Sequence, residues 1–221
     1  MSFVLHIDTA GQTASIAIST NDTLLVEKLN ANQFDHASWI HTALQEAMHE
    51  INLSLDKLDA VCVTIGPGSY TGLRVGLSTA KGLCYALEKP LITIPTLQLI
   101  ASVVECDTNT WICPMIDARR MEVYYAIYDA SLQEIQPAQA LILNAESFLD
   151  ELKTHKIIFC GNGMEKFKPL CSSDKASFST ASATAAAMIP IALGKFLKKD
   201  FADLAYCTPL YVKEFYSGPK S

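Results

Sequence analysis

The chain has 221 residues, of which 50% are hydrophobic and 18% are charged, and its formal net charge is −6. This composition is typical of a globular protein with a core sufficient for one large or two small domains. The acidic balance argues against a protein that binds nucleic acid unaided, and the sequence offers neither about 18 consecutive apolar residues for a membrane span nor a signal-peptide pattern at its start.

The first half of the chain predicts an α/β unit. Short apolar and β-branched runs between turn residues indicate strands, and apolar residues at helical spacing indicate helices. The expected elements are strands over 4–8, 13–19 and 24–29, a helix over 35–51 capped by Asp35, a strand over 60–65, a helix over 71–87 and a strand over 91–94. The order βββαβαβ is typical of a sheet that carries helices on its faces.

The second half repeats this order less completely. After Pro95 we expect a helix over 97–104, strands over 111–116, 123–128 and 135–143, a helix over 145–152, a strand over 157–160, a helix over 180–197 interrupted at Pro190, and a last turn after Pro209. The repeated order indicates a duplication. We therefore predict two α/β lobes, 1–96 and 97–221, each a mixed sheet flanked by helices, with the last helix free to pack back on the first lobe.

Seven cysteines are scattered along the chain, at positions 62, 84, 106, 113, 160, 171 and 207. Their number is odd and none forms a C-x-x-C pair, which argues against a disulfide framework. Several lie in apolar runs, where a free cysteine behaves as a small hydrophobic residue. We expect reduced cysteines in a cytoplasmic protein.

The most informative segment, Gly66–Gly82, joins a buried strand to a long helix through a Gly-Pro-Gly turn. This geometry points backbone N–H groups at an anion, as in phosphate-binding loops. The segment nevertheless lacks the Gly-Lys-Ser/Thr ending of a Walker loop, and Gly72 falls one position late for the dinucleotide-binding fingerprint. Its glycines therefore call for another explanation.

Gly72, Gly76 and Gly82 lie inside the predicted helix, where each glycine costs roughly 1 kcal/mol relative to alanine. Close approach of another helix would explain them. The face turned away from the sheet is made almost entirely of small residues: Thr71, Val75, Ser78, Thr79, Gly82 and Ala86. We expect the helix over 35–51 to pack beside this one and the remaining face to meet another subunit.

The helix over 35–51 carries a wide apolar arc, and Trp39 lies outside it. The apolar surface therefore exceeds what one sheet requires. Such a tryptophan indicates an interface or, equally, a side chain that lies flat over a neighbouring loop. The interface predicted from both helices consists of His36, Trp39, Ile40, Ala43, Thr71, Arg74, Val75, Ser78 and Gly82.

Acidic residues at two strand ends suggest a nucleotide site. They resemble the phosphate loops of actin-like ATPases and sugar kinases, in which such carboxylates hold Mg²⁺ and orient water. A Gly-x-Gly turn after a later strand suits an adenine-side loop, although that signal is weak by itself. The alternative is that the aspartates cap turns. The candidate residues are Asp8, Thr9, Asp117, Glu122, Gly161 and Gly163.

Metal-dependent and hydrolytic chemistry is not indicated. His36 and His41 are five residues apart, which separates their side chains by about 140° on a helix, whereas two ligands on one face need a spacing of four. No Gly-x-Ser-x-Gly elbow is present, and Ser69 has no histidine nearby in sequence to activate it. We predict no metal and no catalytic residue.

The motifs resemble those of the TsaB (YeaZ) family over nearly the whole chain, from Leu5 to about Lys213. The most specific is Gly-Pro-Gly-Ser-Tyr-Thr-Gly-Leu-Arg at 66–74. Supporting motifs are Ile-Asp-Thr-Ala at 7–10, Ile-Asp-Ala-Arg at 116–119 with Glu-Val-Tyr at 122–124, and Pro-x-Tyr at 209–211. One departure is Lys213, where members often carry arginine.

The resemblance implies two actin-like (ASKHA, ribonuclease H-like) lobes in a bacterial cytoplasmic protein. Such a protein assists the formation of threonylcarbamoyladenosine at adenosine 37 of tRNA, beside the anticodon, without being the transferase. It pairs with the paralogue TsaD, which carries the metal and nucleotide chemistry, and the small ATPase TsaE joins the pair. The resemblance also implies self-association through the same helical face when the partner is absent, contact with tRNA only through the complex, and no cofactor beyond weak or vestigial ATP or ADP binding.

Two other functions stay open at this point. An actin-like ATP-dependent phosphotransferase or ATPase would use Asp8 and Asp117 and would bind Mg-nucleotide by itself. A peptidase would need bound zinc, and nothing in the sequence supports that chemistry.

Overall fold

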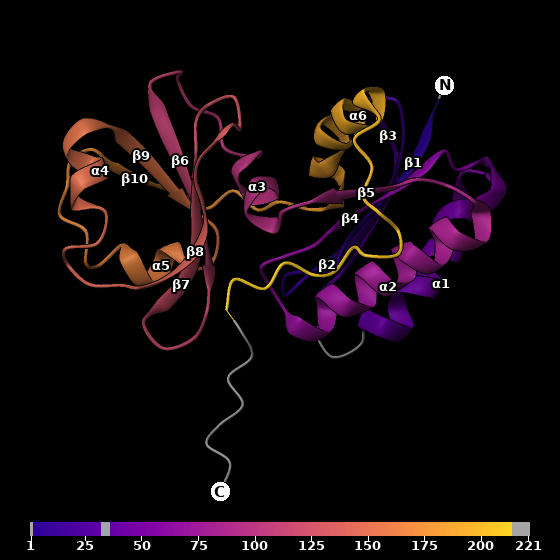
Figure 1. The fold of residues 1–221 in the computed structure, drawn as a ribbon, viewed down its shortest axis with the longest axis horizontal. Coiled ribbons are helices and arrows are strands. Elements are labelled where there is room, and N and C mark those ends of the chain that lie inside the picture. Colours follow the sequence, from indigo (N-terminus) through magenta and orange to yellow (C-terminus); the bar gives the residue numbers. More distant parts are fainter. Residues whose placement is uncertain (1, 32–35, 214–221) are drawn as a thin grey trace, which may run out of the picture. The chain divides into compact units, whose positions relative to one another are not determined.

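The computed structural model describes residues 2–31 and 36–213, in which the chain forms two compact units (Figure 1). Unit 1 comprises Met1–Val103 and Ser182–Pro209, and unit 2 comprises Val104–Ala181 and Leu210–Ser221. This division differs from the predicted one at 96/97. The first helix assigned to the second lobe belongs to unit 1, and so does the helical region that follows residue 181.

Unit 1 contains a five-stranded mixed sheet in which all the predicted strands are confirmed. The strands are β1 (Phe3–Asp8), β2 (Ala14–Thr20), β3 (Thr23–Asn30), β4 (Ala60–Thr64) and β5 (Leu91–Ile94), in the order β3-β2-β1-β4-β5. The first three pair antiparallel, and β1, β4 and β5 pair parallel. β1 is buried along almost its entire length because helices cover both faces of the sheet.

The two faces of this sheet carry different helices (Figure 1). α1 (His36–Glu50) and α2 (Tyr70–Leu87) lie side by side on one face, which confirms the predicted pairing. α3 (Thr96–Ala101), η2 (Ala185–Met188) and α6 (Ile189–Lys198) cover the other, and a short turn of helix, η1 (Leu55–Lys57), precedes β4. Pro190 stands in the first turn of α6, where its missing N–H costs nothing.

Unit 2 repeats the strand order of unit 1. Its strands are β6 (Thr110–Asp117), β7 (Glu122–Tyr128), β8 (Glu134–Ile142), β9 (Lys156–Cys160) and β10 (Ala176–Ser179), in the order β10-β9-β6-β7-β8. β6, β7 and β8 pair antiparallel, and β6, β9 and β10 pair parallel. The predicted duplication and the two-lobe α/β fold are therefore confirmed.

The helices of unit 2 are short and pack on an aromatic core. α4 (Leu149–Thr154) begins four residues later than predicted, because residues 144–148 form a turn in which Ser147 and Asn144 hydrogen-bond each other and Phe148 has a φ of 63°. α5 (Met164–Phe167) and β10 were not predicted. The last turn expected after Pro209 is not helical within the described residues.

Candidate functional site

The end of β1 is closed by helix α2. Thr9 is fully buried, with 0% exposure, and its hydroxyl donates a hydrogen bond of 2.7 Å to the carbonyl oxygen of Gly72. A Cβ atom at Gly72 would lie 2.0 Å from the Thr9 carbonyl oxygen, and one at Gly76 would lie 2.3 Å from Thr9 Oγ1. These glycines let α2 approach β1 inside unit 1. The expectation that Gly72 and Gly76 allow another helix to approach closely is therefore wrong, because both face Thr9 at the end of a strand.

The Gly-Pro-Gly turn before α2 also contacts the protein itself. The N–H of Gly66 donates to Thr96 Oγ1 over 3.1 Å, and the N–H of Ser69 donates to the Ala10 carbonyl oxygen over 2.8 Å. A Cβ at Gly68 would lie 2.5 Å from that same oxygen. Two of the backbone donors that a phosphate could use, the N–H groups of Gly66 and Ser69, are thus engaged, and the turn packs against the end of β1.

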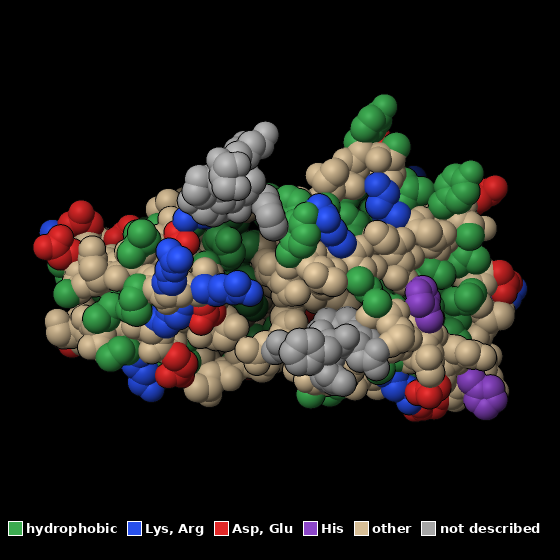
Figure 2. All heavy atoms as spheres, turned by 90° about the horizontal axis from the view of Figure 1, so that it is seen from below, with side chains coloured by type: hydrophobic (Ala, Val, Ile, Leu, Met, Phe, Trp, Pro, Cys, Tyr) green, Lys and Arg blue, Asp and Glu red, His purple; other side chains and the backbone are tan. Residues whose placement is uncertain are grey.

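The outer side of α2 is a different surface. We define the α2 face as six of its exposed residues, Thr71, Arg74, Ser78, Gly82, Tyr85 and Ala86. No atom lies within 4 Å of the place that a Cβ at Gly82 would take. Figure 2 shows this side of unit 1, on which hydrophobic and other uncharged groups cover most of the surface and Lys and Arg side chains lie among them. Such a surface is typical of a contact with another protein.

Fewer residues of α1 contribute to this surface than predicted. Ile40 and Ala43 are 1% and 2% exposed and belong to the core beneath the helix, because they point at the sheet. Trp39 is half-buried and packs against the same core, and Val75 of α2 does so as well. The side chain of His36 and the expected cap Asp35 lie outside the described residues.

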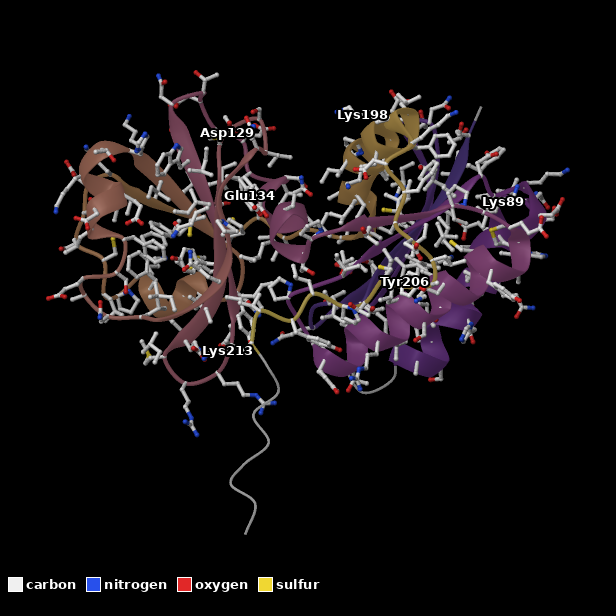
Figure 3. The ribbon with its side chains drawn as sticks, in the orientation of Figure 1. Lys89, Asp129, Glu134, Lys198, Tyr206 and Lys213 are labelled. Atoms are coloured by element: carbon white, nitrogen blue, oxygen red, sulfur yellow. The ribbon has the colours of Figure 1, made fainter. Side chains whose placement is uncertain are left out.

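Two tyrosines beside Gly82 were not predicted. Tyr85 is 80% exposed and stands three residues beyond Gly82 on the same side of α2, so helical spacing could have identified it. Tyr206 is 83% exposed and comes from the far end of the sequence, so no local pattern indicates it (Figure 3). Its segment is held beside α2 because Lys81 Nζ donates to the carbonyl oxygens of Ala205 and Cys207, at 3.2 and 3.1 Å.

Asp8, the aspartate among the candidate nucleotide-site residues of unit 1, accepts hydrogen bonds from residues at the ends of neighbouring strands. Asp8 is nearly buried, and its Oδ1 accepts a hydrogen bond of 2.7 Å from the Thr64 hydroxyl and one of 3.1 Å from the N–H of Ala10. These contacts join the ends of β1 and β4. The alternative that this aspartate organises a turn is therefore supported by its contacts.

The acidic pair of unit 2 is neutralised by lysines. Lys166 Nζ lies 2.6 Å from Asp117 Oδ1, and Lys213 forms an ion pair with Glu122. Burial acts to raise the pKa of the Asp117 carboxyl, but the hydrogen bonds from Lys166 and from the N–H of Arg119, with the charge of the lysine, outweigh it and hold the pKa below its usual value. Asp117 is thus an anion with a resident counter-ion.

Gly161 and Gly163 lie against the same strand end. Asn162 Oδ1 accepts a hydrogen bond of 2.9 Å from the N–H of Asp117, and the N–H of Gly163 donates to the Met115 carbonyl oxygen over 3.0 Å. Gly161 has a φ of 80°, and a Cβ at Gly163 would lie 3.0 Å from the backbone of β6. The Gly-x-Gly turn therefore packs on Asp117, as the Gly-Pro-Gly turn packs on Ala10 in unit 1.

The described residues also bear on metal binding, membrane spans and disulfides. Among those residues no group of three or more His, Cys, Asp or Glu side chains is arranged to hold a metal ion. None of the described helices has both the length and the hydrophobicity needed to cross a membrane. All seven cysteines are free, as predicted.

The fold and its solved relatives define a class. Each unit is a five-stranded mixed sheet with the same strand order, so the chain is a two-lobed α/β protein. The structure titled "YeaZ from Pseudomonas aeruginosa" superposes with a TM-score of 0.78 at 20% identity, covering 96% of this chain and 100% of that one.

Comparison of the sequence identifies the family. The family model described as "TsaD: tRNA N6-adenosine threonylcarbamoyltransferase" matches residues 30–214. The chain is 28% identical over 170 residues to the tRNA threonylcarbamoyladenosine biosynthesis protein TsaB of Bacillus subtilis, covering 76% of this chain and 74% of the relative. The protein of the same name from Haemophilus influenzae is 24% identical over 223 residues, covering 95% and 93%. The chain belongs to this family, in its TsaB (YeaZ) group.

Proposed function

We propose that the chain is a non-catalytic subunit in the formation of threonylcarbamoyladenosine in tRNA, and that it pairs with a TsaD-type protein through the α2 face. The names of its relatives support the pathway. The observation that carries the pairing is the α2 face itself, which is exposed, almost uncharged, open at Gly82 and bordered by exposed Tyr85. Tyrosines around a flat patch of small residues are enriched at protein interfaces.

The contacts at the strand ends support a subunit without phosphoryl-transfer chemistry of its own. In unit 1 Thr9 and Ala10, directly after β1, are buried, and the Thr9 hydroxyl donates its hydrogen bond to the Gly72 carbonyl oxygen. In unit 2 Asp117 and Glu122 each pair with a lysine. A carboxylate that binds Mg²⁺ must offer its oxygens to the metal, and an ammonium group on that oxygen competes with it.

The remaining partners follow from the same proposal. The ATPase TsaE would join the pair, tRNA would meet the chain within the complex, and the same face would form a homodimer when the TsaD-type protein is absent. The seven free cysteines fit a reducing compartment such as the cytoplasm.

The pairing can be tested with one substitution and a matched control. Gly82→Leu places a large side chain in open space on the α2 face, so the monomer should fold as before. We expect its affinity for the TsaD-type protein to fall about 30-fold, the effect of disturbing the centre of an interface. Gly194→Leu is the control: it puts leucine on α6, where a Cβ also meets no atom within 4 Å, and should leave the affinity unchanged.

Binding and modification are both measured. Calorimetry with the purified partner reports the affinity, and a tRNA modification assay with and without this chain reports the role. Equal affinities for the wild type and the Gly82 variant would remove the α2 face from the interface. Tight binding of Mg-ATP by the isolated chain would instead favour the ATPase alternative.

A further inference from the structure

We propose that the tip of the hairpin between β6 and β7 in unit 2 contacts the phosphate backbone of RNA through Arg119 and Arg120. The inference rests on the proposed function, in which the chain works on a tRNA substrate, and it adds a direct contact to it. Every residue involved belongs to unit 2, so the inference does not depend on how the two units are placed.

The first observation is the backbone at the tip. β6 ends at Asp117 and β7 begins at Glu122, and between them Arg119 and Arg120 have φ angles of 69° and 48°. Glycine and asparagine adopt this left-handed conformation most readily. Two consecutive arginines there are not what a tight turn by itself selects. The tip therefore carries arginine for a reason other than folding.

The second observation is that both guanidinium groups are unpaired within the described residues. Arg119 and Arg120 are exposed, and neither side chain forms a hydrogen bond or ion pair in that part of the structure. In contrast, the exposed Arg74 of unit 1 stacks on Tyr70, with its Cζ 3.9 Å from the ring centroid. With respect to residues 2–31 and 36–213, the two arginines of the tip thus have all their side-chain donors available for a ligand.

The third observation is that nearby acids are already neutralised. Lys166 pairs with Asp117, and its Nζ also donates to the Glu122 carbonyl oxygen over 3.3 Å, while Lys213 pairs with the Glu122 side chain. The two arginines therefore add an uncompensated positive charge to a chain whose net charge is −6. Figure 2 shows lysine and arginine side chains gathered on this part of unit 2, and Figure 3 labels Lys213 there.

These features fit a phosphate backbone better than other ligands. Arginine presents a planar fork of donors that matches phosphate oxygens in a bidentate geometry. The tip has no aromatic residue between Asp117 and Glu122 on which a base could stack, so it can position RNA but cannot read its sequence. A small basic tip on an acidic chain is also too weak to bind RNA unaided, which matches a role inside a complex.

The test uses the assembled complex of this chain with its TsaD-type partner and unmodified tRNA. Arg119→Gly with Arg120→Gly removes both charges while keeping residues that tolerate positive φ, so the hairpin should stay folded. We expect tRNA affinity to fall on the order of tenfold at low salt, and the slope of log affinity against log salt to decrease by about 2, one for each lost phosphate contact. Arg119→Lys with Arg120→Lys should retain most of the slope.

The control removes the same charge from the other end of the same sheet. Lys153→Ala with Lys156→Ala acts on α4 and on β9, where Lys156 pairs with Thr110 at the end of β6 opposite Asp117. This variant should bind tRNA with an unchanged slope. Equal affinity and slope for the glycine variant and the wild type would overturn the inference.

The assay separates this inference from the proposed function. Pairing of the two proteins is measured first, without tRNA, and its failure in the wild type would contradict the proposed function alone. If the glycine variant weakens the pairing but leaves tRNA affinity per assembled complex unchanged, the tip contacts an acidic protein surface and the RNA contact is wrong.

Discussion

The two units have one strand order and very different helices. In unit 1, α1 has 15 residues and α2 has 18, whereas their counterparts in unit 2, α4 and α5, have six and four. Both sets of helices bury the face of a five-stranded sheet. In unit 2, phenylalanine side chains help the short helices to bury the face of the sheet. Among them are Phe148, Phe159 and Phe167, which pack edge to face.

The comparison shows that covering a sheet does not require long helices. α2 has length and an exposed face beyond what its core uses, and a surface of small residues along it. Unit 2, without such helices, instead exposes its β6–β7 hairpin with two arginines. In the functions that we propose, the same sheet architecture thus presents a protein-binding surface in unit 1 and a charged hairpin tip in unit 2.

The largest effect on stability is expected at Gly72, where α2 packs against the end of β1 without space for a further atom. Gly72→Ala would put a Cβ 2.0 Å from the Thr9 carbonyl oxygen, and relieving this clash requires a shift of the backbone that we expect to cost about 3 kcal/mol. Urea denaturation measures it. Gly82→Ala is the control, because the site is open and alanine is the better helix former; it should stabilise by about 0.5–1 kcal/mol. Equal midpoints for the two variants would contradict the contact.

A second difference between the units is a buried histidine. Counting back two residues from the aspartate that ends the first strand gives His6 in unit 1 and Met115 in unit 2. Burial lowers the pKa of His6 from 6.5 to about 3, and its Nδ1 has no partner among the described residues. Between those values the unfolded chain binds a proton that the folded chain does not, so stability falls as the pH falls below 6.5.

The loss should approach about 1.4 kcal/mol for each pH unit below 6. His6→Met makes unit 1 like unit 2 at this position and should remove that part of the pH dependence. Urea titrations of both proteins at pH 7, 6 and 5 provide the comparison. Parallel losses in the wild type and the variant would show that other groups cause the acid sensitivity.

The next effect concerns how the helices begin. α2 has a side-chain cap, since Ser69 Oγ accepts a hydrogen bond of 3.2 Å from the N–H of Gly72, whereas α5 begins at Met164 after Gly163, which provides no such cap. Ser69→Ala should destabilise unit 1 by about 1 kcal/mol, and Ser69→Asp should restore the cap. Thermal unfolding followed by circular dichroism tests this order, and an alanine variant as stable as the aspartate variant would contradict it.

The smallest effect belongs to the ion pair of unit 2. Lys166→Gln removes the partner of Asp117, which is partly exposed, so we expect a loss of about 0.5 kcal/mol. The variant should also raise the pKa of Asp117, because the lysine is a main cause of its lowering. Titration of the carboxyl by NMR measures that direction, and an unchanged value would show that the Arg119 N–H suffices.

The strands were predictable because their signals are local. Alternating or continuous apolar runs bounded by turn residues located nine of the ten described strands, and only β10, with four residues and two serines, lacks such a run. α5 has a single helical turn, too short for a periodic pattern. The return of residues 182–209 to unit 1 was foreseen only for the last helix and only as a possibility, because the sequence does not show which lobe such a segment joins.

The outer side of α2 was predictable from the sequence, but the predicted reason for two of the glycines in this helix was wrong. A helical wheel separates the two sides of α2, but it cannot say which glycines meet a neighbour. Gly72 and Gly76 face Thr9, which is distant in sequence, and only Gly82 is open. In the same way the apolar arc of α1 does not show how much of it the sheet covers, and Ile40 and Ala43 are buried. The lysines that neutralise Asp117 and Glu122 are also remote in sequence.

The bridge between Leu91 and Ala202 has a consequence for how the molecule is made. The N–H of Ala202 donates to the Leu91 carbonyl oxygen over 2.8 Å at β5, the edge of the first sheet, and Ala185, Met188 and Ala192 fill the core on one side of that sheet. During synthesis these residues emerge only after the continuous segment of unit 2, Val104–Ala181. The strands that are translated first therefore have one face covered only by α3 until residues 182–209 have left the ribosome.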